Sequence, residues 1–224
     1  MAMIGNVYVD QKNLIFPWNF DPKNTELLFI KTKLIENHIN VDLYSSIEQG
    51  SKEEKVCRYV MQNIAESPDK TWMMVGSRSL GQLYDYAHRI AALFAFSTSG
   101  AATIYSPSEN PEILDSDPSD DEMFYLWKSM LLILINGTTP LSRKHRQNSL
   151  GALLSHRAAR NMRVLWLESY IPEKNATSET VFNSKISIIG NLFPGVVHHF
   201  YSSGTFLWLK AKTPSTFSCA DMEG

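Results

Sequence analysis

Residues 119–137 have the sequence Ser-Asp-Asp-Glu-Met-Phe-Tyr-Leu-Trp-Lys-Ser-Met-Leu-Leu-Ile-Leu-Ile-Asn-Gly, and this stretch decides the predicted fold. Its start, Ser119-Asp-Asp-Glu122, is typical of a helix N-terminus, and Asn136-Gly137 is typical of a helix end. Apolar side chains surround such a helix on nearly all sides, so we expect it at the centre of a core that includes Trp127, Leu131 and Leu134. The apolar run 130–135 is far shorter than the roughly 20 residues that span a bilayer, so no membrane span is expected.

Further helices are predicted on the N-terminal side of this stretch. Two starts resemble capping boxes, Ser51-Lys-Glu-Glu54 and Ser79-Leu-Gly-Gln82, and apolar residues follow each at three- and four-residue spacing. Residues 25–47 favour a helix first, although the alternation of Ile39, Val41 and Leu43 would also suit a strand. The predicted fold class is mainly α, with helical lobes, an extended N-terminal arm and possible short β elements at the N- and C-terminal ends.

The composition suggests how these elements are arranged along the chain. We predict an arm over 1–25, an N-terminal helical lobe over 26–105, an acidic proline-rich linker over 106–122, and a C-terminal helical lobe and tail over 123–224. The length of 224 residues allows a real core, and the net charge of −2 means that any polyanion site must be local. With only Cys57 and Cys219 and no signal peptide at the start, we expect free thiols in a reducing, cytoplasmic compartment.

No stretch of the sequence supplies a familiar catalytic motif. A P-loop requires Gly-x-x-x-x-Gly-Lys-Ser/Thr, which is missing, and the run Gly76-Ser-Arg-Ser-Leu-Gly81 lacks the spacing of a hydrolase elbow and predicts a helix start instead. Asp115-Ser-Asp-Pro-Ser-Asp120 has no glycine or bidentate glutamate where a calcium loop needs them. His198-His199 has no further ligand at metal-binding spacing. We therefore predict no enzyme activity, no cofactor and no metal site.

One segment carries a marked excess of positive charge. Residues 143–170 predict an amphipathic helix, stopped by Pro172, with a basic face. The candidate nucleic-acid-binding residues are Arg143, Lys144, Arg146, Arg157, Arg160 and Arg163. Arginine suits bidentate phosphate contacts, so we expect binding to the backbone of single-stranded RNA without sequence readout. Alternatively, these cations form a solvated face or pair with the acidic loop 109–122.

A cationic helix between helical lobes, together with an apolar arm, resembles the layout of nucleocapsid or coat proteins of RNA viruses. The resemblance implies a non-enzymatic, self-assembling RNA-binding protein found in the cytoplasm or in the virion. The arm residues Ile15, Phe16, Trp18 and Phe20 would mediate self-association by docking on the next subunit. The alternative is a structural, matrix or adaptor protein whose basic helix binds an acidic protein partner.

Overall fold

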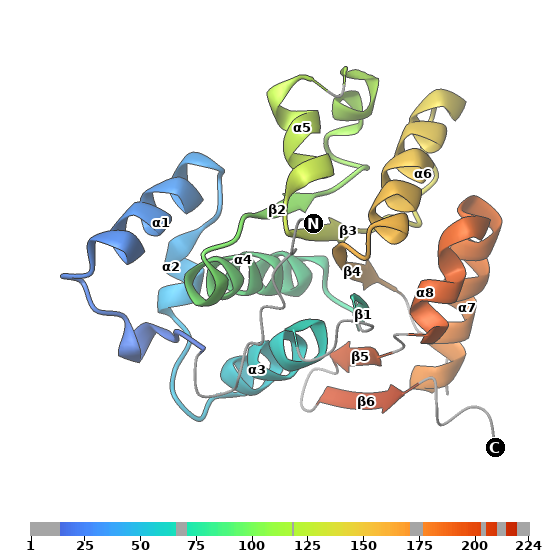
Figure 1. Cartoon of the computed structure of the whole chain (residues 1–224). Helices are drawn as coiled ribbons and strands as arrows, with labels where there is room; N and C mark the ends of the chain where they lie inside the picture. Colours follow the sequence, from blue (N-terminus) through green and yellow to red (C-terminus); the bar gives the residue numbers. More distant parts are fainter. Residues whose placement is uncertain are drawn as a thin grey trace.

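The computed structural model describes residues 14–65, 71–117, 119–170, 177–202, 205–209 and 214–218. In this part of the chain the strands form one six-stranded sheet in the order β2-β3-β4-β1-β5-β6 (Figure 1). The strands are β1 (Trp72–Ser77), β2 (Ala102–Tyr105), β3 (Leu131–Ile135), β4 (Arg163–Ser169), β5 (Thr205–Leu209) and β6 (Pro214–Ser218). In this order the five strands β2, β3, β4, β1 and β5 are each parallel to their neighbours, and β6 pairs antiparallel to β5.

Helices cover both faces of this sheet. One face carries α1 (Thr25–Glu36), α2 (Val41–Ser45), α3 (Lys52–Ala65) and α4 (Leu80–Thr98), and the other carries α5 (Asp121–Lys128), α6 (Lys144–Ala159), α7 (Ser178–Leu192) and α8 (Val197–Ser202). Short 3-10 turns lie at Pro17–Asn19, Pro111–Asp115 and Pro194–Val196. No helix of the described residues has the length and apolar character needed to cross a membrane.

The strand order explains why the helices divide in this way. The connection from β1 to β2 crosses the sheet in one direction, whereas the connections from β2 to β3, β3 to β4 and β4 to β5 run in the other. Because crossovers between parallel strands are right-handed, opposite directions place their helices on opposite faces. Hence α4 lies on one face, and α5, α6 and α7 lie on the other.

The prediction of a mainly helical fold is wrong, and its decisive stretch shows why. Residues 121–128 do form α5, but the chain then turns at Ser129 and Met130, and the five aliphatic residues of β3 follow. Leu131 and Leu134 are fully buried, as predicted for the core, and Trp127 is half-buried. A strand covered on both faces is apolar throughout and shows no alternation, so its pattern resembles that of a buried helix.

The predicted helix over 143–170 is also two elements. Helix α6 ends at Ala159, where Asn161 adopts a left-handed backbone with φ of 50°. The amide of Met162 donates to the carbonyl of Arg157 at 2.8 Å, and the amide of Asn161 donates to that of Ala158 at 3.1 Å. This is the Schellman arrangement that ends helices. The chain then reverses and enters β4.

Several local predictions are confirmed. Helix α3 follows Ser51, whose hydroxyl accepts a hydrogen bond from the Glu54 amide at 3.1 Å, and helix α4 follows the N-cap Ser79. The region 25–47 is helical in α1 and α2, so the alternative strand over 39–43 is wrong. The predicted linker 106–122 lies between β2 and β3 in the sequence, and these two strands pair directly with each other.

The described part of the predicted arm packs on its own core. Phe16 is 1% exposed, and Phe20 meets Phe96 edge-on with ring centroids 5.2 Å apart. The amide of Ile15 donates to the hydroxyl of Ser97 at 3.0 Å. Trp18 stays 40% exposed while stacking on Phe16. The predicted docking of these residues on a neighbouring subunit is therefore replaced by docking within the chain, and residues 1–13 lie outside the described part.

Cys57 is a free thiol in the core of α3, whereas Cys219 lies outside the described residues. Burial raises the pKa of Cys57 to about 12, and a thiol must ionise and be reached to react. In a Cys219→Ser variant, we expect no labelling of the folded protein by a thiol reagent at pH 8 and full labelling in denaturant. Rapid labelling of the native variant would contradict this burial.

Candidate functional site

The carboxyl ends of β1 and β4 form the topological switch point of the sheet. These strands are neighbours, but the chain leaves β1 toward β2 and leaves β4 toward β5, through helices on opposite faces. Ligands of open α/β sheets bind in the crevice that opens where adjacent connections diverge in this way. The residues at this point are therefore the first place to look for function.

The connection from β1 to α4 carries the glycine spacing of a P-loop. Gly76 and Gly81 are separated by four residues, β1 precedes them, and α4 begins at Leu80. Gln82 stands where a P-loop has its phosphate-binding lysine, and Leu83 stands where it has the Ser or Thr that contacts Mg²⁺. Leucine has no hydroxyl to bind a metal, and the side chain of Leu83 is fully buried.

The backbone of this connection is too short to wrap a phosphate group. Only Arg78 and Ser79 lie between the strand and the helix. Ser77 still belongs to the sheet, opposite Ser169 of β4 and Leu209 of β5. A P-loop instead uses several free amides of a glycine-rich loop.

Side-chain hydrogen bonds close the connection further. The buried Ser77 hydroxyl donates to the carbonyl oxygen of the Gln82 side chain at 2.6 Å and accepts from the amide of Ser79 at 3.1 Å. The amide of Gln82 donates to the Ser79 hydroxyl at 3.3 Å. Gln82, at the lysine position, is thus turned toward the strand.

Asn136 occupies the position directly after β3, where P-loop NTPases hold Mg²⁺ through an aspartate. Its backbone is left-handed, with φ of 52°, which asparagine tolerates better than most residues. Its side-chain oxygen accepts hydrogen bonds from the amide and the hydroxyl of Ser169, at 2.8 and 2.9 Å. Asn136 therefore ties β3 to β4 with a neutral amide.

A buried ion pair lies near the carboxyl end of β4, between this strand and α7. The Glu168 carboxylate, on β4, accepts from the amide and hydroxyl of Thr138 at 2.9 and 2.8 Å, and from the Trp166 indole at 2.7 Å. The Lys185 ammonium of α7 lies 3.0 Å from the same carboxylate. All the contacts of Glu168 are thus internal, which makes this cluster a structural lock between β4, the loop after β3, and α7.

The geometry of the sheet and its switch point can be compared with solved structures. The fold is similar to that of the DnaC helicase loader. The two chains share 14% sequence identity with a TM-score of 0.52, over 77% of this chain and 97% of that one. DnaI (15% identity, TM-score 0.47, 74% of this chain and 89% of that one) and AMPPCP-bound DnaA from Aquifex aeolicus (10%, 0.45, 66% and 49%) have lower TM-scores.

The likeness to the DnaC helicase loader agrees with the mixed α/β fold and its parallel sheet, which replace the predicted helical fold. No family model matches the sequence. No curated protein matches it either.

The predicted nucleic-acid-binding residues do not share one surface. Their places are the α6 N-cap for Arg143, the first turn of α6 for Lys144 and Arg146, the last turn of α6 for Arg157, the α6 C-cap for Arg160, and the start of β4 for Arg163. Arg157 and Arg163 are buried, at 0% and 8% exposure, so the predicted exposed face with Arg157, Arg160 and Arg163 is wrong. Helix α6 ends at Ala159, before Arg163, so these residues do not lie on one helical face.

Arg157 instead holds three segments together inside the core. Its guanidinium donates to the carbonyls of Leu126 at 2.9 Å, Ser129 at 2.9 Å and Arg163 at 2.8 Å. Burial lowers the pKa of Arg157 to about 9, and within the described residues no carboxylate forms an ion pair with it. The backbone carbonyls are its hydrogen-bond partners in place of phosphate.

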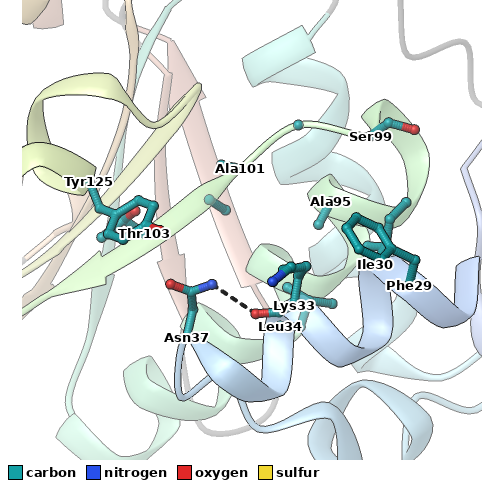
Figure 2. A pocket seen from close by; sticks show the side chains of 12 residues that line it. Phe29, Ile30, Lys33, Leu34, Asn37, Ala95, Ser99, Ala101, Thr103 and Tyr125 are labelled. Carbon is teal, nitrogen blue, oxygen red and sulfur yellow. Dashed lines mark hydrogen bonds between the residues drawn. The ribbon is translucent and has the colours of Figure 1, made fainter. Parts of the chain in front are cut away.

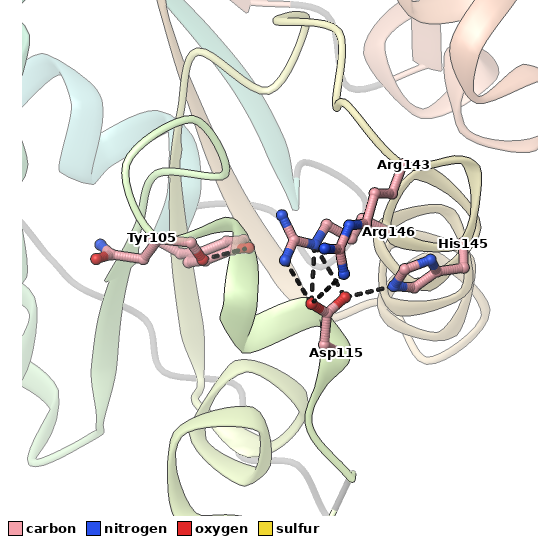
Figure 3. Close-up of polar contacts among 6 residues, drawn as sticks. Tyr105, Asp115, Arg143, His145 and Arg146 are labelled. Atoms are coloured by element: carbon pink, nitrogen blue, oxygen red, sulfur yellow. Dashed lines mark hydrogen bonds and ion pairs between the residues drawn. The ribbon is translucent and has the colours of Figure 1, made fainter.

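The start of α6 pairs with the acidic segment, as the alternative prediction had it. Asp115 receives the bidentate guanidinium of Arg146, with the Nε atom 2.9 and 3.0 Å from the two oxygens, and also contacts His145 and, at 3.7 Å, Arg143 (Figure 3). The hydrogen bond from Arg146, and then that from His145, hold the pKa of Asp115 well below its usual range. These cations are thus engaged within the chain.

The nucleocapsid or coat interpretation, with single-stranded RNA and self-assembly through the arm, is wrong on these findings. The fold is a mixed α/β fold similar to that of the DnaC helicase loader, Arg157 and Arg163 are buried, and the described arm packs on its own core. The signal that could have revealed the site was the buried strand 72–75, followed by two glycines with four residues between them and by a helix. Because Gln82 stands at the lysine position, the sequence does not match the P-loop motif.

Proposed function

We propose that this chain is an accessory protein of DNA replication that engages a replicative DNA helicase through protein contacts and does not hydrolyse ATP. The likeness to the DnaC helicase loader suggests the helicase as the partner. The residues of this chain at the switch point suggest that it does not hydrolyse ATP. One observation carries the proposal: Gln82, Leu83 and Asn136 replace the three groups that bind phosphate and Mg²⁺, and each is buried or hydrogen-bonded within the protein.

The substitutions remove what phosphoryl transfer needs most. Catalysis in P-loop NTPases depends on positioning and on positive charge that neutralises the phosphates, supplied by lysine and by Mg²⁺. Here a neutral amide stands at each of the two key positions, Gln82 and Asn136. Opening a phosphate-binding loop would also require Ser77 to leave its pairing with β4 and β5. Both effects disfavour nucleotide binding.

We expect no saturable binding of a fluorescent ATP analogue with Mg²⁺, and no phosphate release above the buffer blank, under conditions where a P-loop ATPase gives both. Restoring the lysine in a Gln82→Lys variant should not produce binding, because the two-residue connection still lacks a phosphate cradle. Saturable binding or hydrolysis by the original chain would refute the proposed lack of ATPase activity.

The helicase contact is tested separately. The chain is mixed with the hexameric replicative helicase of its source organism, and the complex is measured by size-exclusion chromatography with light scattering. We expect co-elution that is the same with and without Mg²⁺-ATP. An unrelated protein of similar size serves as the control, and failure to co-elute would overturn the assignment to helicase binding while leaving the nucleotide result intact.

A further inference from the structure

The free edge of the sheet at β2 carries a second candidate site, independent of the proposed function. Strand β2 is the outermost strand on its side, and its only sheet partner within the described residues is β3. Two adjoining cavities of about 250 and 650 Å³ follow this edge and share Ala102, Thr103, Asn37 and Tyr125 in their walls. Together they form what we call the β2 groove.

The backbone of β2 offers hydrogen-bonding groups to this groove. The amide of Leu131 in β3 donates to the carbonyl of Ala101 at 3.2 Å, so the backbone of Ala101 faces β3. Backbone groups alternate along a strand, so those of Thr103 face β3, and those of Ala102 and Ile104 face outward. Among the described residues none forms a hydrogen bond with these outward groups.

The walls of the groove are mainly apolar at one end, where the ammonium of Lys33 lies 5.6 Å from the centroid of the Phe29 ring. Helix α1 contributes Phe29 and Ile30 on one side of the edge, and α5 contributes Tyr125 on the other (Figure 2). Phe29 is 62% exposed and Tyr125 is 44% exposed. Large aromatic groups left in water beside an open strand edge are the features by which extended peptides are captured.

The other end of the groove is strongly acidic. The carboxylates in its walls belong to Glu36, Glu109, Glu112, Asp121 and Glu122. Among the described residues no lysine or arginine lines this end, where His38 and His88 are the basic side chains, and Lys33 of the adjoining cavity pairs with Glu36 at 2.6 Å. Charge complementarity therefore favours an occupant that carries lysine or arginine at this end.

We propose that the β2 groove binds an extended segment of another protein, which adds to the sheet as a strand beside β2. The segment would place an aromatic or aliphatic side chain against Phe29 and Tyr125, and lysines or arginines against the acidic end. Main-chain hydrogen bonds to Ala102 and Ile104 supply the pairing, and the two ends of the groove supply the specificity.

A synthetic probe tests this site with the full chain. The probe is a fluorescein-labelled peptide in which lysine alternates with valine or phenylalanine, and its binding is followed by fluorescence anisotropy. Two control peptides keep its length: one replaces lysine with glutamate, and the other is N-methylated at alternate residues so that one edge cannot donate hydrogen bonds. We expect saturable binding of the lysine peptide and about a tenfold or greater loss of affinity for both controls.

Matched variants locate the binding on the protein. Tyr125→Ala and Phe29→Ala should each weaken binding about tenfold, whereas Phe124→Ala, an exposed neighbour outside the groove, should change nothing. Ile104→Pro removes an outward amide that would donate to the bound strand, so it should abolish binding. The variant should still fold, because proline is tolerated on the open side of an edge strand. Thermal melting of each variant verifies folding.

Three results would overturn the proposal. The first is equal binding of the lysine and N-methylated peptides, which would exclude strand addition. The second is unchanged affinity in Tyr125→Ala and Phe29→Ala variants that melt normally. The third is a dimer in light scattering that becomes a monomer in the Tyr125→Ala variant, which would make a second copy of the chain the occupant of the groove. None of these results depends on whether the chain binds a helicase.

Discussion

Replacing Arg157 with alanine is expected to lower the free energy of unfolding by about 3–5 kcal/mol, a large part of the total for an ordinary domain. The guanidinium donates to carbonyls of α5, of the turn before β3 and of β4, and all of these lie inside the core. Without it those carbonyls lose their donor in a site that water cannot easily enter, and each such loss costs about 1–3 kcal/mol.

Urea denaturation followed by tryptophan fluorescence measures this effect. Arg160→Ala is the matched control, because Arg160 lies at the end of the same helix but is exposed, and its removal should change stability by no more than about 0.5 kcal/mol. Arg157→Lys keeps the charge but loses the planar fork, so it should fall between the two. A loss below about 1 kcal/mol for Arg157→Ala would show that the three carbonyls find other donors.

Removing the Lys185 ammonium is the second change with a large expected effect. A Lys185→Met variant should lose about 3–5 kcal/mol, because it leaves the Glu168 carboxylate, only 2% exposed, without its counter-charge. The donors from Thr138 and Trp166 remain, but they are neutral and do not replace a positive charge.

A double-mutant cycle separates the ion pair from simple loss of packing. The Glu168→Leu, Lys185→Met double variant should be more stable than Lys185→Met alone, since the unpaired buried charge has gone. Lys144→Met, at an exposed lysine in α6, is the control and should have little effect. Strictly additive losses in the cycle would mean that Lys185 and Glu168 do not stabilise each other.

The sequence by itself determined the elements whose signals are local. Ser51 and Ser79 mark the starts of α3 and α4, because a capping hydroxyl and the apolar spacing behind it act within one or two turns. Burial of Leu131 and Leu134 also followed from the apolar run 130–135. The pairing of the acidic segment with the start of α6 was among the alternatives that charge suggested, and Asp115 and Arg146 realise it.

Only the tertiary structure decided which apolar runs are strands. The runs at 72–75, 131–135 and 164–167 are buried on both faces, so they carry no alternation, and a parallel strand gains its hydrogen bonds only from partners distant in sequence. The fate of the arginines depended on the same step. Once the chain reverses at Asn161, Arg157 and Arg163 turn into the core, and no helical wheel drawn from the sequence contains that reversal.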